Sequence, residues 1–179
     1  RDLVFDLSEP LVAITADFTG SELLLFGATD GTGDVVVVVR GPLRDQVVRR
    51  KDRVSGVWVN REGIKFSDVP DYYAVASNRP IDEFISREVR DANQIGAAHL
   101  ALSSASEGIA PGKLNDFRNA LIRNKQREGL YSTKTEDLIF LSERLFRTSL
   151  RFPANVAVGT YGIDVYLMRN GEVAGVETK

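Results

Sequence analysis

Five consecutive valines, Val35 to Val39, limit the possible folds of this chain more than any other feature. Their β-branched side chains favour an extended strand, bounded by Asp34 and Arg40. A strand that is apolar at every position has no polar face to turn toward water, so both of its faces must be covered. We therefore predict a strand at residues 34–40 that is buried on both faces.

Short strand patterns separated by turn residues fill most of the remaining chain. In residues 160–169, for example, apolar and polar side chains alternate, and Asn170-Gly171 then marks a two-residue hairpin turn. Many short strands with turns between them predict a mainly β fold, an antiparallel immunoglobulin-like β-sandwich with a helical insertion. The other expected strands cover residues 3–7, 11–18, 22–27, 45–53, 54–60, 63–66, 72–77, 137–141, 145–152 and 172–178.

Residues 54–66 carry two further predictions. The tripeptide Arg61-Glu62-Gly63 predicts a tight turn between two strands. Aromatic residues favour strands and core positions, so Trp58 is assigned to the hydrophobic core together with Tyr72 and Tyr73.

The helical insertion is expected between about residues 80 and 130. Pro80 suits the first turn of a helix, and this helix is expected to fade by residues 93–96. A second helix is expected at residues 113–128. Because the helices interrupt the strands without forming a unit of their own, residues 1–179 are predicted to form a single β-sandwich domain. The core-facing side of the second helix carries Leu114, Phe117, Leu121 and Lys125.

The segment from Pro153 through Gly159 to Tyr161 is typical of a tyrosine corner in immunoglobulin-like sandwiches. In such a corner a tyrosine enters the next strand after a turn, and its hydroxyl bonds to the backbone of the preceding loop. We therefore predict that the Tyr161 ring is buried and that its hydroxyl bonds to a nearby backbone group.

The composition excludes much of common enzymology. With no Cys and one His, the chain has no disulfide, no thiol catalysis and no two-histidine metal site. His99 with Ser103 or Ser104 could formally belong to a hydrolase triad, but there is no Gly-x-Ser-x-Gly motif. The segment 30–34 could be a calcium loop, but it lacks the EF-hand spacing and is interpreted as a hairpin loop. We predict a non-enzymatic protein with no catalytic residue, no cofactor and no metal site.

The charges are unevenly distributed, although the net charge is only −2. Residues 1–34 carry a net charge of −6 and residues 35–53 a net charge of +4. We interpret this asymmetry as neighbouring strands that neutralise each other across their solvent faces. The alternative is a basic patch that meets an anionic partner. Nucleic-acid binding is not expected, because the aromatic pattern of RNA-binding motifs is missing from the sequence.

The densest basic run lies between residues 49 and 53. On a strand, Arg49, Lys51 and Arg53 share one face while Arg50 lies on the other. We interpret the run as an exposed strand whose charges prevent edge-to-edge aggregation. Arg49, Lys51 and Arg53 are the candidate contacts with an anion or a partner.

The sequence has no recognisable secretory signal and no membrane span. Its longest apolar run is the five-valine strand, whereas a helix needs about 20 apolar residues to cross a bilayer.

Several long phrases stand out in order along the chain, at residues 18–27, 34–42, 48–60, 73–77, 127–131, 145–148 and 153–161. Taken together, they resemble the alphaproteobacterial putative transmembrane protein family, whose function is uncharacterised. The resemblance covers essentially the whole chain.

The resemblance implies a protein with an N-terminal signal, an extracytoplasmic domain and a single C-terminal membrane helix. This chain would then be the periplasmic part, anchored to the inner membrane through a helix that this chain does not contain. The implied function is that of a non-enzymatic, membrane-tethered periplasmic binding module whose partner is a membrane or envelope protein. The resemblance supplies no catalytic residues.

The alternative is an accessory of a membrane transporter that binds small oxyanions of sulfur. Arg49 or Arg53 would then line a pocket, because arginine forks suit oxyanions. The two functions predict different geometries: convergence of the basic side chains into a pocket favours the anion site, and a solvated strand favours the binding module.

Overall fold

The computed structural model describes residues 3–7, 19–104 and 106–179 and is mainly β, as predicted. The expected strand at 11–18 lies outside the described residues. The strands are β1 (Leu3–Leu7), β2 (Ser21–Thr29), β3 (Asp34–Arg40), β4 (Leu43–Val54), β5 (Val57–Pro70), β6 (Tyr73–Ser77), β7 (Ser103–Ser104), β8 (Glu136–Phe140), β9 (Leu145–Phe152), β10 (Gly162–Arg169) and β11 (Glu172–Thr178). The helices are α1 (Arg87–Asn93) and α2 (Pro111–Arg127), with short 3-10 turns at Ile81–Glu83 and Ala97–His99.

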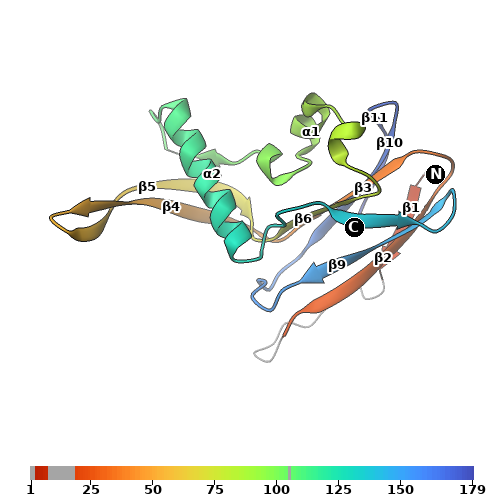
Figure 1. Ribbon diagram of the computed structural model, residues 1–179, viewed down its shortest axis with the longest axis horizontal. Helices are drawn as coiled ribbons and strands as arrows, with labels where there is room; N and C mark the ends of the chain where they lie inside the picture. Colours follow the sequence, from red (N-terminus) through yellow and green to blue (C-terminus); the bar gives the residue numbers. More distant parts are fainter. Residues whose placement is uncertain (1–2, 8–18, 105) are drawn as a thin grey trace.

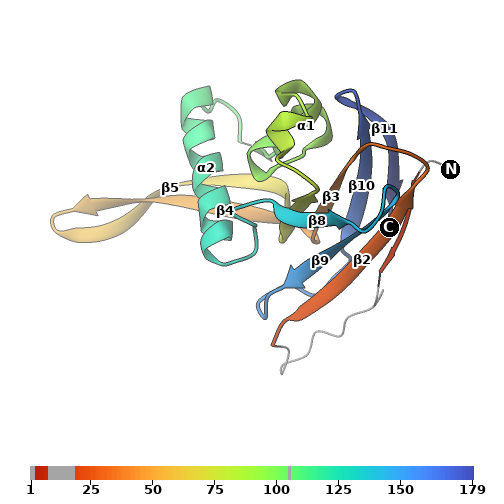
Figure 2. The ribbon, with the colours of Figure 1, turned by 45° about the vertical axis from the view of Figure 1, so that its right-hand side comes forward.

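Eight strands form one curved sheet in the order β1-β2-β9-β8-β6-β3-β10-β11 (Figures 1 and 2). Its two four-stranded halves meet where β6 pairs with β8. The outer strands β1 and β11 also lie side by side, because the Lys179 ammonium is 2.8 Å from the Asp6 carboxylate and 5.3 Å from the centre of the Phe5 ring. The sheet therefore almost closes on itself.

The prediction of a wholly antiparallel sandwich is wrong at one pair, because β6 and β8 run parallel. The helical insertion separates these two strands in the sequence. It carries the chain back to the end of the sheet where β6 began, and a long crossover of this kind is what a parallel pair requires. The other pairings of the described strands are antiparallel, as predicted.

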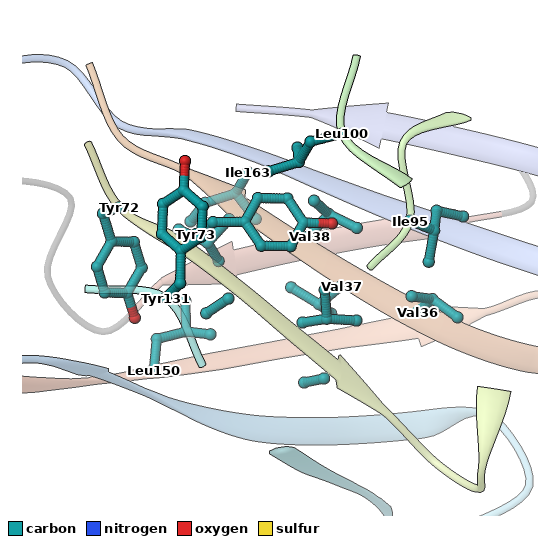
Figure 3. Close-up of a cluster of buried hydrophobic side chains, with 14 of the residues drawn as sticks. Val36, Val37, Val38, Tyr72, Tyr73, Ile95, Leu100, Tyr131, Leu150 and Ile163 are labelled. Atoms are coloured by element: carbon teal, nitrogen blue, oxygen red, sulfur yellow. The ribbon is translucent and has the colours of Figure 1, made fainter. Parts of the chain in front are cut away.

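The five-valine strand β3 lies between β6 and β10, and none of its valines is exposed to solvent. Because side chains alternate along a strand, the valines point to both faces of the sheet. Val36 lies beside Ile95 of the helical insertion, whereas Val37 lies on the other side, toward Leu150 of β9 (Figure 3). The prediction of a strand buried on both faces is confirmed.

The helices lie between residues 81 and 127, within the predicted insertion. The first expected helix is divided into the 3-10 turn at Ile81–Glu83 and a separate helix, α1, which begins at Arg87. Ser86 caps this second start, and its hydroxyl accepts a hydrogen bond from the Val89 N–H at 3.3 Å. On α2 the predicted core-facing side is confirmed at three positions, while Leu114 is half-buried. The buried residues of α2 are Phe117, Leu121, Ile122 and Lys125.

Strands β4 and β5 form a long hairpin whose turn differs from the prediction. The turn is Ser55-Gly56, and both residues have positive φ, 50° and 82°, as a tight primed hairpin turn requires. The predicted turn at residues 61–63 is wrong, because β5 runs through them. Arg50 pairs with Glu62 and Lys51 with Asn60, so the chain accommodates an extra residue there as a β-bulge.

The loop at residues 30–34 is not a hairpin loop, because the strands on either side of it are not neighbours. β2 lies between β1 and β9, whereas β3 lies between β6 and β10. The loop therefore crosses from one half of the sheet to the other. Within the described residues, no group of three or more acidic or histidine side chains could hold a metal ion.

The tyrosine corner is present at Tyr161. Its hydroxyl donates a hydrogen bond to the Ala157 carbonyl at 2.6 Å, as predicted. The ring packs edge-on against Phe152 and Tyr72, with centroids 5.5 and 5.9 Å away. The ring is half-buried, where full burial was expected, and this burial raises the pKa of the hydroxyl above its ordinary value.

We expect Tyr161→Phe to lower the free energy of unfolding by about 0.5–1.5 kcal/mol, because it removes the hydroxyl bond and keeps the ring. Tyr161→Ala should cost about 2 kcal/mol or more, because the two ring contacts are lost as well. Urea unfolding followed by circular dichroism measures both. An unchanged unfolding midpoint for the Ala variant would contradict a structural role for the corner.

Candidate functional site

The hairpin of β4 and β5, residues 43–70, projects from the body of the molecule as an arm (Figures 1 and 2). Near its base, one face of the arm is covered, and α2 contacts β4 there. Val48 and Ile64, which pair across the two strands, are the last buried side chains toward the tip. Beyond this pair the described side chains are exposed or half-exposed, so the outer part of the arm contributes little to the core.

A buried ion cluster holds the base of the arm to the body. Asp71 follows β5 directly and is only 7% exposed. Its carboxylate lies 2.8 Å from the guanidinium of Arg44 on β4 and 3.3 Å from the ammonium of Lys125 on α2. The Gln46 amide donates a third bond at 3.3 Å. One carboxylate therefore joins the arm, the helical insertion and the main sheet.

Tyr131 also holds the base of the arm, through a buried hydrogen bond. Its hydroxyl donates a hydrogen bond to the carbonyl of Pro70, the last residue of β5, at 2.6 Å. Burial raises the pKa of this hydroxyl well above its ordinary value, so it remains a donor throughout the physiological pH range. The position of the last residue of the arm is therefore set by buried groups.

The outer face of the arm, the face turned away from Val48 and Ile64, carries the three candidate cations. Directly opposed residues of an antiparallel pair lie on the same face. Arg53 is opposite Trp58, and Arg49 is opposite Gly63. Arg49, Lys51 and Arg53 are exposed, as predicted, and form no ion pair within the described residues. The structure thus brings the three predicted residues together on one face and adds Trp58 to them.

The tip of the arm is apolar and exposed. Val54, Val57 and Trp58 flank the Ser55-Gly56 turn and are 37%, 63% and 66% exposed. The assignment of Trp58 to the core is wrong, because a residue beside this turn lies beyond the reach of the core. Tyr72 and Tyr73 are buried, as predicted. The Ser-Gly dipeptide is itself a turn marker and would have placed Trp58 at a hairpin tip.

The arm is also electrically distinct from the body. Residues 43–70 contain seven basic and four acidic residues, a net charge of +3, which leaves −5 for the remainder of a chain with net charge −2. For the described strands, the interpretation that residues 35–53 neutralise residues 1–34 across neighbouring strands is wrong. Within the described residues, β4 pairs with β5 and β3 is buried between β6 and β10. The positive charge therefore projects into solvent.

The other polar groups considered in the sequence lie elsewhere. The His99 ring contacts the Asp91 carboxylate and lowers the pKa of that carboxyl. Ser103 and Ser104 form β7 and pair with β5, and neither is hydrogen-bonded to His99 in the part of the chain described here. The structure therefore does not bring a hydrolase triad together from these residues.

A hollow of about 820 Å³ is bordered by the 31–34 loop, the start of the helical insertion and the turn between β10 and β11. Its arginines are already paired. Arg79 bonds both oxygens of Asp34, at 2.9 and 2.8 Å, and holds the pKa of that carboxyl below its usual range, while Arg169 lies 2.8 Å from Asp30. The three cations of the arm do not line this hollow.

A protein-family model described as a putative transmembrane protein (Alph_Pro_TM) matches residues 2–179. Neither the curated proteins nor the solved structures contain a match to this chain. Among the described residues, no helix is both long enough and apolar enough to cross a membrane.

We expect Asp71→Asn to lower the free energy of unfolding by about 3–5 kcal/mol, because it leaves the buried Lys125 ammonium without a counter-charge. Lys125→Met is the matched control. It keeps the volume of the side chain and leaves Asp71 paired with Arg44, so its cost should be below about 1.5 kcal/mol. Urea unfolding of the two variants tests the assignment, and equal losses would show that Asp71 is not the centre of the cluster.

Proposed function

This chain belongs to the putative transmembrane protein family Alph_Pro_TM, and on that premise we propose that it is a non-enzymatic binding module that contacts its partner through the arm. We further propose that the module is periplasmic, that a C-terminal helix outside this chain anchors it to the inner membrane, and that its sheet is an immunoglobulin-like sandwich. The partner proposed from the sequence is a membrane or envelope protein, and the arm would be the part of the module that meets the membrane or a component of it.

The observation that carries this proposal is the exposed outer half of the arm. Val57 and Trp58 are more than three-fifths exposed, although large apolar side chains normally gain stability by burial. Arg53 lies directly beside Trp58, and Lys51 and Arg49 follow it along the same face. Trp and Arg are also the residues that most often dominate binding energy at interfaces. An arm of this kind adds little to folding, so its apolar tip is best explained by a contact outside the chain.

The transporter accessory is the less favoured function. An oxyanion site needs side chains that converge on one point, whereas Arg49, Lys51 and Arg53 follow one another along an exposed strand. Successive residues on one strand face are about 7 Å apart, so the first and last of these cations are about 14 Å apart at the backbone. This spacing suits an extended charged surface more than a small ion.

We expect a photo-crosslinking amino acid at position 58 of the full-length protein to capture a partner in native membranes, because this residue is at the tip of the arm. The same amino acid at Glu172, an exposed residue of β11, is the control. Crosslinked products identified by mass spectrometry at position 58 and not at position 172 are the expected outcome. Equal labelling at both positions would contradict a contact role for the arm.

Sulfite and sulfate should not raise the melting temperature in a saturable way, since the arm has no enclosed anion site. A ligand at 100 times its dissociation constant would add about 2.7 kcal/mol of stability, which a thermal-shift titration detects easily. Saturable stabilisation that disappears in Arg49→Ala and Arg53→Ala would instead establish the transporter accessory.

A further inference from the structure

We propose that the arm docks on the surface of an anionic phospholipid bilayer, with Val54, Val57 and Trp58 entering the interface and the cations of the outer face lying over the phosphates. This inference rests on the proposed function and names the class of partner that the arm meets. It is carried by three features of the arm: how its backbone ends, where its only tryptophan lies, and how its free charges are arranged.

The backbone of the tip is suited to the headgroup region of a bilayer. Pairing between β4 and β5 continues to Val54 and Val57, so the arm ends in a tight two-residue turn. β5 pairs with β7 only at Phe66 and Ser67, so in the outer arm the outward-facing backbone groups of both strands have no ladder partner among the described strands. Such groups need water or headgroup partners, so the tip fits the hydrated headgroup region and not the hydrocarbon core.

Trp58 is the only tryptophan of the chain. Its indole combines an apolar ring with one N–H donor, and this combination favours the boundary between acyl chains and headgroups. Val54 and Val57 are directly opposed and lie on the other face of the hairpin from Trp58, so exposed apolar side chains occupy both faces of the tip. Together they form a small wedge and not a wide apolar face.

The charges favour lipid over protein as the occupant. Arg53 shares its face with Trp58, and Lys51 and Arg49 follow at every second residue. No described ion pair has to be broken to engage them. Protein–protein interfaces are depleted of lysine although arginine is enriched there, and a stable interface buries about 1,200–2,000 Å². A narrow tip with cations along one face fits a plane of phosphates better.

The net charge makes this docking specific to the arm. The chain is negative overall, so a general attraction to an anionic surface is not expected. Attraction must come from the local excess of positive charge on the arm. Cations near an anionic bilayer each contribute about a fivefold gain in binding, so the three together account for about 100-fold.

The test is sedimentation of the chain with vesicles of phosphatidylglycerol and, in parallel, of phosphatidylcholine. We expect binding to phosphatidylglycerol that weakens as salt is added, because exposed charges are screened. The emission of Trp58 should shift to the blue on binding, and no other tryptophan contributes to this signal.

Three variants locate the contact. Trp58→Ser should remove most of the binding. Gln at the three cations of the outer face should weaken it about 100-fold, as estimated above. The matched control is Gln at three exposed arginines of the body, and it should bind like the wild type. These control residues are Arg144, Arg147 and Arg151.

Each remaining outcome overturns the lipid inference. Failure of the wild type to bind phosphatidylglycerol, or equal losses in the outer-face and body variants, would show that the arm is not a lipid contact. If position 58 still crosslinks a protein in native membranes, the proposed function stands and the occupant is a protein with an acidic surface. If the chain does not bind phosphatidylglycerol vesicles and position 58 does not crosslink a partner, the arm is not a contact site.

Discussion

The burial of the five-valine strand on both faces is the constraint on which the rest of the structure depends. One face of β3 is covered by the opposite half of the curved sheet and the other by the helical insertion, through residues such as Ile95 (Figure 3). A sheet alone would leave one row of valines in water. The insertion is therefore a structural necessity. Because it must leave the sheet after β6 and return before β8, it also explains why these two strands run parallel.

The same constraint separates the arm from the core. Gly41-Pro42 ends β3, and the chain then leaves the main sheet for a hairpin that returns only at Asp71. The core is complete without the outer half of that hairpin. The fold fixes the base of the arm, where Asp71 and Tyr131 hold the two ends of the hairpin with buried polar contacts. The arm is thus fixed at its base and free of contacts with the core at its tip.

The sequence predicts features that depend on local patterns and misses those that depend on pairing. The buried strand β3, the hydroxyl bond of Tyr161 and the burial of Lys125 on α2 follow from periodicity or a short motif. The exposed cations were also expected. The parallel pair, the bulge near Arg61 and the partner of Lys125 were not, because they depend on which distant segments meet. Trp58 was misassigned for a related reason: composition favours burial of an aromatic ring, whereas the position of the turn decides it.

The separation of charge between arm and body bears on how a negatively charged molecule can approach an anionic surface. Six residues of β4 lie beyond the last buried pair, and at about 3.3 Å per residue they extend about 20 Å. This length is roughly twice the Debye length of about 8–10 Å in physiological salt. Repulsion between the body and the surface is therefore largely screened when the tip touches it, while Arg53, opposite Trp58 at the tip, lies within range. The length of the arm and the placement of its charge together favour an approach tip first.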